Sequence, residues 1–492
     1  MATYLLGIDI GTSACKVALF DASGTAHAQA SAPYGVRYPK PGWAEQDPEA
    51  WWQAVCVALR SMMENAGIVP EDIAGIGVDG QSWSAIPVDA QGSVLAPTPI
   101  WTDTRAVSIC REIEQAVGWE TLFQCSGNPL QPSYTLPKIL WYKENMPDVY
   151  ARADKILQSN SFIVQRLTGE ISQDLSQGYG YACFDMRRGT WDKGLCAALG
   201  VRPSLLPALF TCHEVVGRVT EQAAKQTGLC QGIPVVAGGL DAACGALGAG
   251  VLFSGQTQEQ GGQAGGMSLC VDQYAADPRL ILSAHVVQGR WLLQGGTTGG
   301  GGALKWLRET MCPDLSFAAM GELADAVPAG SNGVVFLPYM AGERSPIWNP
   351  DACGVFFGLS YAKGRGELIR AVMEGVAFAL RHNLETACAA GAEAGTLRAM
   401  GGSANSHVWT QMKSDITGCP IEVPGSDTAT TLGAALLAGV GTGVYESFET
   451  AVAETVSVKR THQPNPVTKA VYDREYTRYR ELYDRLAPMM HA

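Results

Sequence analysis

Strand-length apolar runs alternate with helical segments along the first half of the chain, and this alternation limits the possible folds most strongly. The runs Leu5–Ile10 and Val17–Phe20 flank a short turn and predict a hairpin of two buried strands. Asp47-Pro48 marks a helix start, with a capping carboxylate followed by a first-turn proline. Ile73–Asp79 predicts another strand and Arg105–Val117 another helix. This order of elements indicates an α/β fold.

The chain is too long for one hydrophobic core. Single cores rarely grow beyond roughly 250–300 residues, so a chain of 492 residues predicts two domains. Hydrophobic residues make up 47% of the sequence, which is enough for two large cores. The pattern of glycines changes after the helical segment Ala242–Leu247, so we place the boundary near residue 250 and expect domains at 1–250 and 251–492.

The charge and the cysteine content restrict the partners and the compartment. A formal net charge of −12 disfavours nucleic acid or an anionic membrane as the main partner. No apolar run approaches the roughly 20 residues that span a bilayer. The 14 cysteines include no Cys-x-x-Cys pair. We therefore expect a cytoplasmic protein with reduced thiols that binds neither nucleic acid nor a membrane.

The turn after the first strand is a candidate phosphate site. Asp9 lies near the end of the strand, and Thr12, Ser13 and Lys16 follow it. Backbone N–H groups and hydroxyls of such a turn can surround phosphate oxygens, while Asp9 can hold a hydrated Mg²⁺. Lys16 can neutralise phosphate charge. An ordinary hairpin turn with a solvated aspartate and lysine is the structural alternative.

A carboxylate at a later strand end is a candidate general base. Asp241 follows Gly238 and Gly239 at the end of a predicted strand that begins at Pro234. Flanking glycines let a ligand approach, and a helix that begins at Ala242 favours the ionised carboxylate. A helix N-cap aspartate is the structural alternative here.

Glycine clusters in the second half are candidates for nucleotide binding. Gln260–Gly266 and Gly299–Gly302 lie among short strands, and the second cluster leads into a predicted helix. A third cluster, Gly401–Ser406, precedes a helix from His407 to Thr417. Structural turns are the alternative. The Gly-x-Gly-x-x-Gly pattern at residues 75–80 lies within a strand instead of opening a helix, so we reject it as a dinucleotide site.

Taken together, these segments resemble the FGGY family of carbohydrate kinases along nearly the whole chain. The family's C-terminal signature is similar to Gly354-Val-Phe-Phe-Gly358-Leu359 followed by Glu367-Leu368 and Ala371-Val-Met-Glu374. Its N-terminal signature is similar to the string from Ser133 to Asn145, in which Tyr142 replaces the usual aliphatic residue or Phe.

The resemblance implies two ribonuclease-H-like domains, as in actin and hexokinase, with the catalytic cleft between them. It implies transfer of phosphate from ATP, with Mg²⁺, to a small sugar, first of all a ketopentose such as xylulose. Another polyol, sugar acid or ketose is the alternative, and a poorly catalytic sensor of sugar or nucleotide is a further one. A homodimer is the candidate assembly.

The resemblance also assigns roles to residues. Asp241 would be the general base and Asp9 would organise Mg²⁺. The substrate side would be formed by Gln81, Ser82, Trp83, Asp103, Asp241 and Ala242. ATP would be bound by Thr12, Ser13, Lys16, Gly262, Gln263, Gly301, Lys305, Gly402, Asn405 and Ser406.

Besides Tyr142, the chain departs from the family pattern at three places. Members that phosphorylate xylulose usually carry Gln-Met-His-Gly where this chain has Gln81-Ser-Trp83-Ser, and Asn where it has Ala242. Both changes remove polar contacts to a sugar. The second phosphate loop is usually Gly-Thr-Ser-Gly, whereas the segment Gly262–Gly265 has no hydroxyl, so only its backbone N–H groups remain for phosphate.

Overall fold

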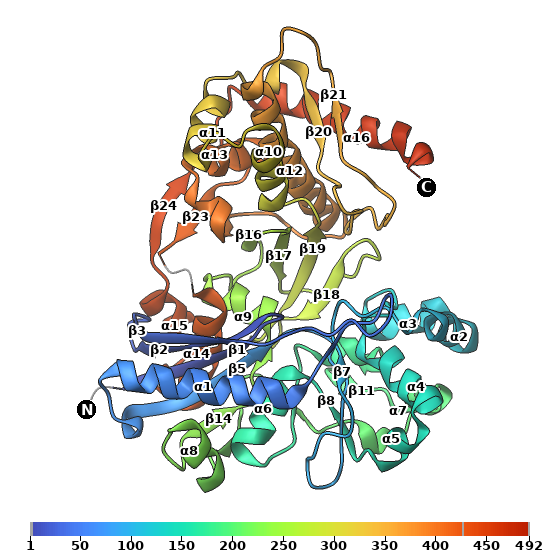
Figure 1. The fold of residues 1–492 in the computed structure, drawn as a ribbon, viewed down its shortest axis with the longest axis vertical. Helices are drawn as coiled ribbons and strands as arrows, with labels where there is room; N and C mark the ends of the chain where they lie inside the picture. Colours follow the sequence, from blue (N-terminus) through green and yellow to red (C-terminus); the bar gives the residue numbers. More distant parts are fainter. Residues whose placement is uncertain (1–2, 426–427, 491–492) are drawn as a thin grey trace. The chain divides into compact units, whose positions relative to one another are not determined.

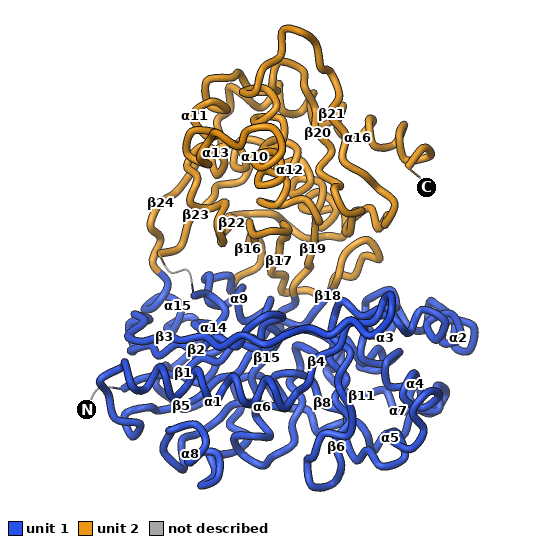
Figure 2. The backbone as a smooth tube through the Cα atoms, viewed as in Figure 1, with its two compact units in different colours: residues 1–252, 282–291, 428–456 blue, residues 253–281, 292–427, 457–492 orange. Residues whose placement is uncertain are grey.

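The computed structural model describes residues 3–425 and 428–490, which form two compact units (Figure 2). Unit 1 comprises residues 1–252, 282–291 and 428–456, and unit 2 comprises 253–281, 292–427 and 457–492. The first break lies close to the expected boundary near residue 250. In addition, two later segments return to unit 1, which no local sequence signal indicated.

Unit 1 is built on a mixed sheet with strand order β13-β14-β5-β1-β2-β3, and β15 pairs with β5. Figure 1 labels β1, β2, β3, β5 and β14 of this sheet. The strands are β1 (Tyr4–Ile10), β2 (Ala14–Asp21), β3 (Ala26–Pro33), β5 (Ile73–Gly80), β13 (Val215–Arg218), β14 (Pro234–Val236) and β15 (Gly239–Leu240). The antiparallel pair β1–β2 confirms the predicted hairpin. β5 runs parallel to β1, and the register places Asp9 beside Asp79.

Helices cover both faces of this sheet. On one face, α1 (Pro48–Ala66) buries Trp51 and Val55 in the same core as Ile8. It begins, as predicted, after Asp47, whose side chain accepts a hydrogen bond from the Glu49 N–H.

On the other face, α14 (Ala429–Gly441) packs directly onto two glycines of the sheet. A Cβ atom at Gly7 would lie 1.9 Å from the carbonyl oxygen of Thr431, and one at Gly77 would lie 1.8 Å from that of Ala434. The Gly-x-Gly-x-x-Gly pattern therefore lies in a strand, as predicted, and its central glycine permits a close helix–sheet contact.

The remaining elements of unit 1 are short. Its helices are α2 (Val107–Val117), α3 (Trp119–Ser126), α4 (Thr135–Asn145), α5 (Pro147–Arg152), α6 (Ser159–Thr168), α7 (Lys193–Ala198), α8 (Glu221–Thr227), α9 (Asp241–Gly248) and α15 (Phe448–Thr455). Its small strands are β4 (Glu45–Gln46), β6 (Ile86–Val88), β7 (Thr98–Pro99), β8 (Lys155–Leu157), β9 (Gln173–Asp174), β10 (Phe184–Asp185), β11 (Thr190–Trp191) and β12 (Leu209–Phe210).

Unit 2 contains a second mixed sheet with the run β19-β17-β16-β22-β23-β24. The later strands of the chain are β16 (Thr257–Gly261), β17 (Gly265–Val271), β18 (Ile281–Ala284), β19 (Trp291–Thr297), β20 (Val335–Leu337), β21 (Val355–Phe357), β22 (Leu397–Met400), β23 (Ile421–Pro424) and β24 (Val458–His462). The helices are α10 (Gly301–Met311), α11 (Phe317–Asp325), α12 (Arg365–Ala389), α13 (His407–Thr417) and α16 (Lys469–Leu486). In the described residues no helix is long and apolar enough to cross a membrane.

Candidate functional site

Three carboxylates gather at the carboxyl ends of neighbouring strands in unit 1. Asp9 of β1 is in parallel register with Asp79 of β5, and Asp79 is in register with Gly239 of β15. Asp241 follows β15 as the first residue of α9. The structure therefore brings the two predicted aspartates to one edge of one sheet.

Asp79 lies between these strands and was missed by the sequence interpretation. Its side chain is fully buried, and neither carboxylate oxygen has a hydrogen-bond partner among residues 3–425 and 428–490. Burial, followed by the negative charges of Asp9 and Asp241, raises its pKa well above the usual range. The available signal is an aspartate at a strand end with glycine within two residues, as at Asp9, but the glycines around Asp79 also match the dinucleotide pattern that the strand position excludes.

The backbone around Asp241 is held by a buried polar network. Ser176 accepts a hydrogen bond from the Leu240 N–H at 2.8 Å and donates to Asp174 at 2.5 Å. Gly238 has φ of +77° and a hypothetical Cβ there would lie 1.9 Å from the Val78 carbonyl oxygen, so glycine is required at this strand end. Burial and then the charge of Asp9 raise the pKa of Asp241 to about 7.

The predicted phosphate turn lies beside this cluster. The Lys16 ammonium is 3.2 Å from an Asp9 carboxylate oxygen, and that negative charge raises the pKa of Lys16. The Thr12 hydroxyl accepts a hydrogen bond from the Trp101 indole at 2.9 Å, and Ser13 is exposed. Both hydroxyls keep a proton to donate, so their expected contact with phosphate stays a prediction.

The predicted substrate segment at residues 81–83 follows β5. Gln81 donates from its side chain to Gln46 and from its backbone to the Ile10 carbonyl. Ser82 and Ala242 are half-buried. Trp83 adopts a left-handed backbone with φ of +61°, which is uncommon for a bulky residue.

The indole of Trp83 is packed among aromatic rings. Its centroid lies 4.7 Å from that of Tyr134 and 5.9 Å from that of Tyr179, and the side chain is 7% exposed. Its Nε1–H has no partner among the described residues. The tryptophan thus combines core packing with one unused donor, and its role as a wall of the sugar site stays a prediction.

One face of α4 holds this segment in place. Thr135, Lys138 and Tyr142 lie at helical spacings of three and four residues, so they project from the same face. Their side chains donate to three successive carbonyls: Lys138 to Trp83 at 2.8 Å, Thr135 to Ser84 at 3.2 Å and Tyr142 to Ala85 at 3.1 Å.

The same face of α4 also holds a second segment. Lys138 donates to the Ile100 carbonyl at 2.8 Å and Tyr142 to the Pro97 carbonyl at 3.0 Å. Lys138 is fully buried, and this burial lowers its pKa to about 7. The helix therefore joins the segment at 83–85 to the segment at 97–100.

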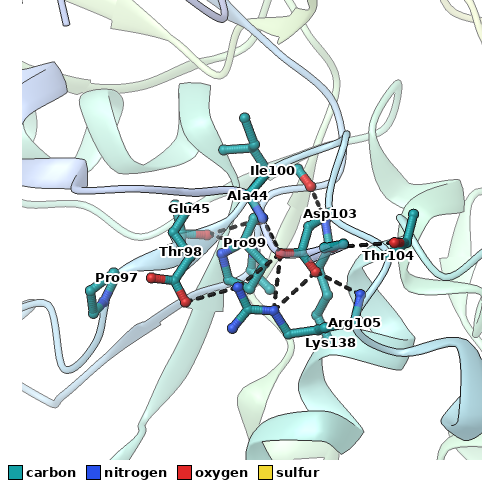
Figure 3. A network of polar contacts seen from close by, with 12 residues as sticks. Ala44, Glu45, Pro97, Thr98, Pro99, Ile100, Asp103, Thr104, Arg105 and Lys138 are labelled. Carbon is teal, nitrogen blue, oxygen red and sulfur yellow. Dashed lines mark hydrogen bonds and ion pairs between the residues drawn. The ribbon is translucent and has the colours of Figure 1, made fainter. Parts of the chain in front are cut away.

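The second segment leads to Asp103, whose carboxylate is already engaged (Figure 3). Its Oδ2 accepts hydrogen bonds from the Ala44 N–H at 2.7 Å and from Arg105 Nη2 at 2.8 Å. The same guanidinium pairs with Glu45 at 2.8 Å and stacks 3.8 Å above the ring of Trp43. The contact of Asp103 with sugar hydroxyls stays a prediction, and its observed role is to fix this loop.

In unit 2 two of the glycine clusters form one backbone surface. The N–H groups of Gly301 and Gly302, at the start of α10, donate to the carbonyls of Gly262 and Gln263 at 2.7 and 2.9 Å. A Cβ atom at Gly300 would lie 2.3 Å from the Ala264 carbonyl carbon, so glycine allows the two loops to touch. These two N–H groups at the helix start are thus already used between the loops.

The other predicted nucleotide residues lie near the third cluster or on α10. Ser406 caps α13 by accepting a hydrogen bond from the Trp409 N–H, and Gly402 and Asn405 are exposed. Lys305 is an exposed residue of α10, 3.9 Å from Glu309. Their contacts with a nucleotide stay predictions.

A buried ion pair contacts the third glycine cluster, Gly401–Ser406. Lys413 donates to Glu259 at 2.6 Å and to the Ser403 hydroxyl at 2.8 Å. A Cβ atom at Gly261 would collide with that hydroxyl at 1.5 Å, so the cluster at 401–406 packs tightly onto the end of β16.

The comparisons with known proteins agree with the resemblance noted in the sequence. Residues 4–248 match the N-terminal domain of the FGGY family of carbohydrate kinases, and residues 275–442 match its C-terminal domain. This chain belongs to the FGGY family. It is a carbohydrate kinase with the family's two-domain α/β fold, and ATP is its phosphoryl donor.

Individual relatives match over their full length. Xylulose kinase from Escherichia coli (strain K12) is 32% identical, with 99% of each chain covered. The crystal structure of xylulose kinase from Rhodospirillum rubrum has a TM-score of 0.92 at 32% identity and covers 99% of this chain and 100% of its own. Gluconate kinase from Lactobacillus acidophilus has a TM-score of 0.92 at 27% identity, with 99% of both chains covered.

Proposed function

We propose that this protein transfers the γ-phosphoryl group of ATP to a ketopentose, with xylulose as the first candidate. The observation that carries this proposal is the similarity to E. coli xylulose kinase, at 32% identity over 99% of both chains. Gluconate is the second candidate because gluconate kinase from L. acidophilus has a structure equally similar to this one, with a TM-score of 0.92.

The residues of unit 1 support a base-assisted transfer. Asp241 accepts the proton of the attacking sugar hydroxyl, and its pKa of about 7 suits a base that works near neutral pH. Lys16, which contacts Asp9, and the turn at Thr12 and Ser13 would line the phosphate path. Phosphoryl transfer depends mainly on positioning and charge neutralisation, so this set is chemically sufficient.

The same residues fit a magnesium ion. No group of three or more His, Cys, Asp or Glu side chains within 3–425 and 428–490 is arranged to hold a metal. Mg²⁺ typically needs only one or two carboxylates when phosphate oxygens and water complete its shell. Asp9 provides one such carboxylate, and the bound ion would neutralise charge on the transferred phosphate.

The pKa of Asp241 predicts the pH dependence of catalysis. Only the deprotonated carboxylate accepts a proton, so a pKa raised to about 7 means that activity is lost as the pH falls through 7. We expect kcat/KM for the sugar to fall about tenfold for each pH unit below that point. Initial rates between about pH 5 and 9 at saturating ATP test this. A profile that stays flat down to about pH 5 would contradict the raised pKa.

The residues at positions 83 and 242 predict how many polar contacts the protein makes with the sugar. Trp83→His together with Ala242→Asn adds polar groups where the chain has an indole and a methyl group. One or two new hydrogen bonds of about 0.5–1.5 kcal/mol each should raise kcat/KM on D-xylulose by about tenfold. Trp83→Phe with Ala242→Asn is the matched control, since it lacks the imidazole. If Trp83→His with Ala242→Asn melts like the wild type but its kcat/KM on D-xylulose is unchanged or lower, position 83 has no part in sugar recognition.

An assay of substrate-dependent ADP release tests the proposed function itself. A panel of ketopentoses, other ketoses, polyols and sugar acids is compared at equal concentration by a coupled assay. We expect the highest kcat/KM with a ketopentose. If gluconate or another sugar acid exceeds every ketose in the panel, the second candidate replaces the first.

A further inference from the structure

The carboxylate of Asp79 has no role in the proton transfer described above. Its side chain is fully buried on β5, which lies between β1, the strand of Asp9, and β15, the strand that precedes Asp241. Its two oxygens lack a hydrogen-bond donor among the described residues. Buried polar groups in proteins are nearly always satisfied, and an unsatisfied one commonly marks a functional site or an ion that is not present.

Asp79 shares a sheet face with Asp9. Both residues lie two positions beyond the glycines, Gly7 and Gly77, on which α14 packs, and side chains two residues apart in a strand point to the same side. In a parallel pair the two aspartates are immediate neighbours. Two adjacent carboxylates repel each other in the buried state unless a proton or a cation lies between them.

Another buried aspartate of the same unit shows what a purely structural carboxylate looks like here. Asp174 is also fully buried, and its oxygens accept hydrogen bonds from the side chains of Asn160, Gln173 and Ser176 and from the Gln177 N–H. All of its acceptor positions are supplied by the protein. Asp79 has no such set of donors, so a proton shared with Asp9 or a bound cation has to balance its carboxylate.

We propose that Asp79 is a second carboxylate ligand, beside Asp9, for the divalent cation that accompanies the nucleotide. This inference rests on the proposed phosphoryl transfer, yet it concerns metal binding and is measured without sugar. Oxygen ligands from two carboxylates are the set that Mg²⁺ and Mn²⁺ favour, with water and phosphate completing the shell. Asp241, on the other side of Asp79, remains free for the proton of the sugar.

Titration of the full-length protein with Mn²⁺ alone tests this directly. Free Mn²⁺ is followed by its electron paramagnetic resonance signal in the wild type, Asp9→Asn and Asp79→Asn. Removing groups that merely support a metal ligand costs roughly 10- to 100-fold in affinity, so loss of a ligand should weaken Mn²⁺ binding at least about tenfold. Wild-type affinity in Asp79→Asn, or no measurable binding by the wild type, would overturn the proposal.

Thermal unfolding provides a second readout and a matched control. In a chelating buffer Asp79→Asn should melt at or above the wild-type temperature, because it removes the repulsion between two neighbouring buried carboxyl groups. Asp174→Asn should melt lower, because it disturbs a satisfied network, while keeping its Mn²⁺ affinity. Addition of Mg²⁺ should raise the melting temperature of the wild type and leave that of Asp79→Asn unchanged. An equal Mg²⁺ shift in both proteins would count against the ligand role.

The outcomes separate this inference from the proposed function. Mn²⁺ binding that depends on Asp79 in a protein that phosphorylates no sugar of the panel would leave the metal ligand in place and remove the ketopentose assignment. Phosphorylation of a ketopentose together with Mn²⁺ binding that does not depend on Asp79 would keep the ketopentose assignment and remove the metal-ligand role of Asp79.

Discussion

Asp241→Asn should lower kcat by about two to four orders of magnitude, which is the usual contribution of a positioned general base. The amide has nearly the same shape as the carboxylate but cannot accept the hydroxyl proton. The side chain starts α9 and its neighbour Leu240 is held by Ser176, so the substitution should leave the backbone in place. Steady-state kinetics with the preferred sugar and a melting curve measure the two effects.

The control for this prediction is an aspartate far from any predicted site. Asp148→Asn changes an exposed residue of α5 in the same unit and should keep wild-type kcat. The KM for ATP should change little in Asp241→Asn, because no nucleotide role is predicted for this residue. Near wild-type turnover in that variant would exclude Asp241 as the base.

Lys138→Met should weaken both stability and sugar binding. The substitution leaves the buried carbonyl of Trp83 without a donor. It also removes one of the two donors of the Ile100 carbonyl, which keeps the Asp103 N–H. The unsatisfied carbonyl costs about 1–3 kcal/mol and the second lost hydrogen bond about 0.5–1.5 kcal/mol, while removal of a buried charge offsets part of this, so we expect the free energy of unfolding to fall by about 1–3 kcal/mol. The sugar KM should rise at least about tenfold, because small misplacements of a binding segment cost up to about 100-fold.

The chain offers a matched control on the same helix. Lys143 is exposed and donates to the Gly200 carbonyl, so Lys143→Met removes a lysine and one hydrogen bond without touching the segments at 83–85 and 97–100. It should change the free energy of unfolding by less than about 0.5 kcal/mol and leave the KM for the sugar and the KM for ATP unaltered. If Lys138→Met destabilises the protein but leaves the sugar KM at the wild-type value, α4 is a purely structural support.

Local patterns in the sequence were sufficient for the elements that local chemistry determines. The hairpin of β1 and β2 follows from two apolar runs around a turn, and α1 begins where Asp47 caps it. The helix predicted from His407 to Thr417 has those bounds in α13. The sequence indicates Asp9 and Asp241 because each stands at a strand end within two residues of a glycine, which is where a ligand can approach an α/β sheet.

Features that depend on distant pairing could not be found in this way. Asp79 gains its meaning only from the parallel register of β5 with β1 and β15. The donors of α4 lie in the segment from Ser133 to Asn145 that resembles the family's N-terminal signature. The carbonyls that they contact, however, lie some 40–60 residues earlier in the chain. The return of residues 428–456 to unit 1 depends on α14 packing against Gly7 and Gly77, and a single sequence carries no local sign of that contact.

The most direct test of the account is the fate of the γ-phosphoryl group of ATP. Phosphorus nuclear magnetic resonance of a reaction with ATP, Mg²⁺ and D-xylulose follows ATP, ADP, inorganic phosphate and any sugar phosphate together. For the wild type we predict one pentulose monophosphate formed for each ADP, with little free phosphate, and almost no product with Asp241→Asn in the same time. Inorganic phosphate in place of a sugar phosphate, or equal product from Asp241→Asn, would contradict a ketopentose kinase that uses Asp241 as its base.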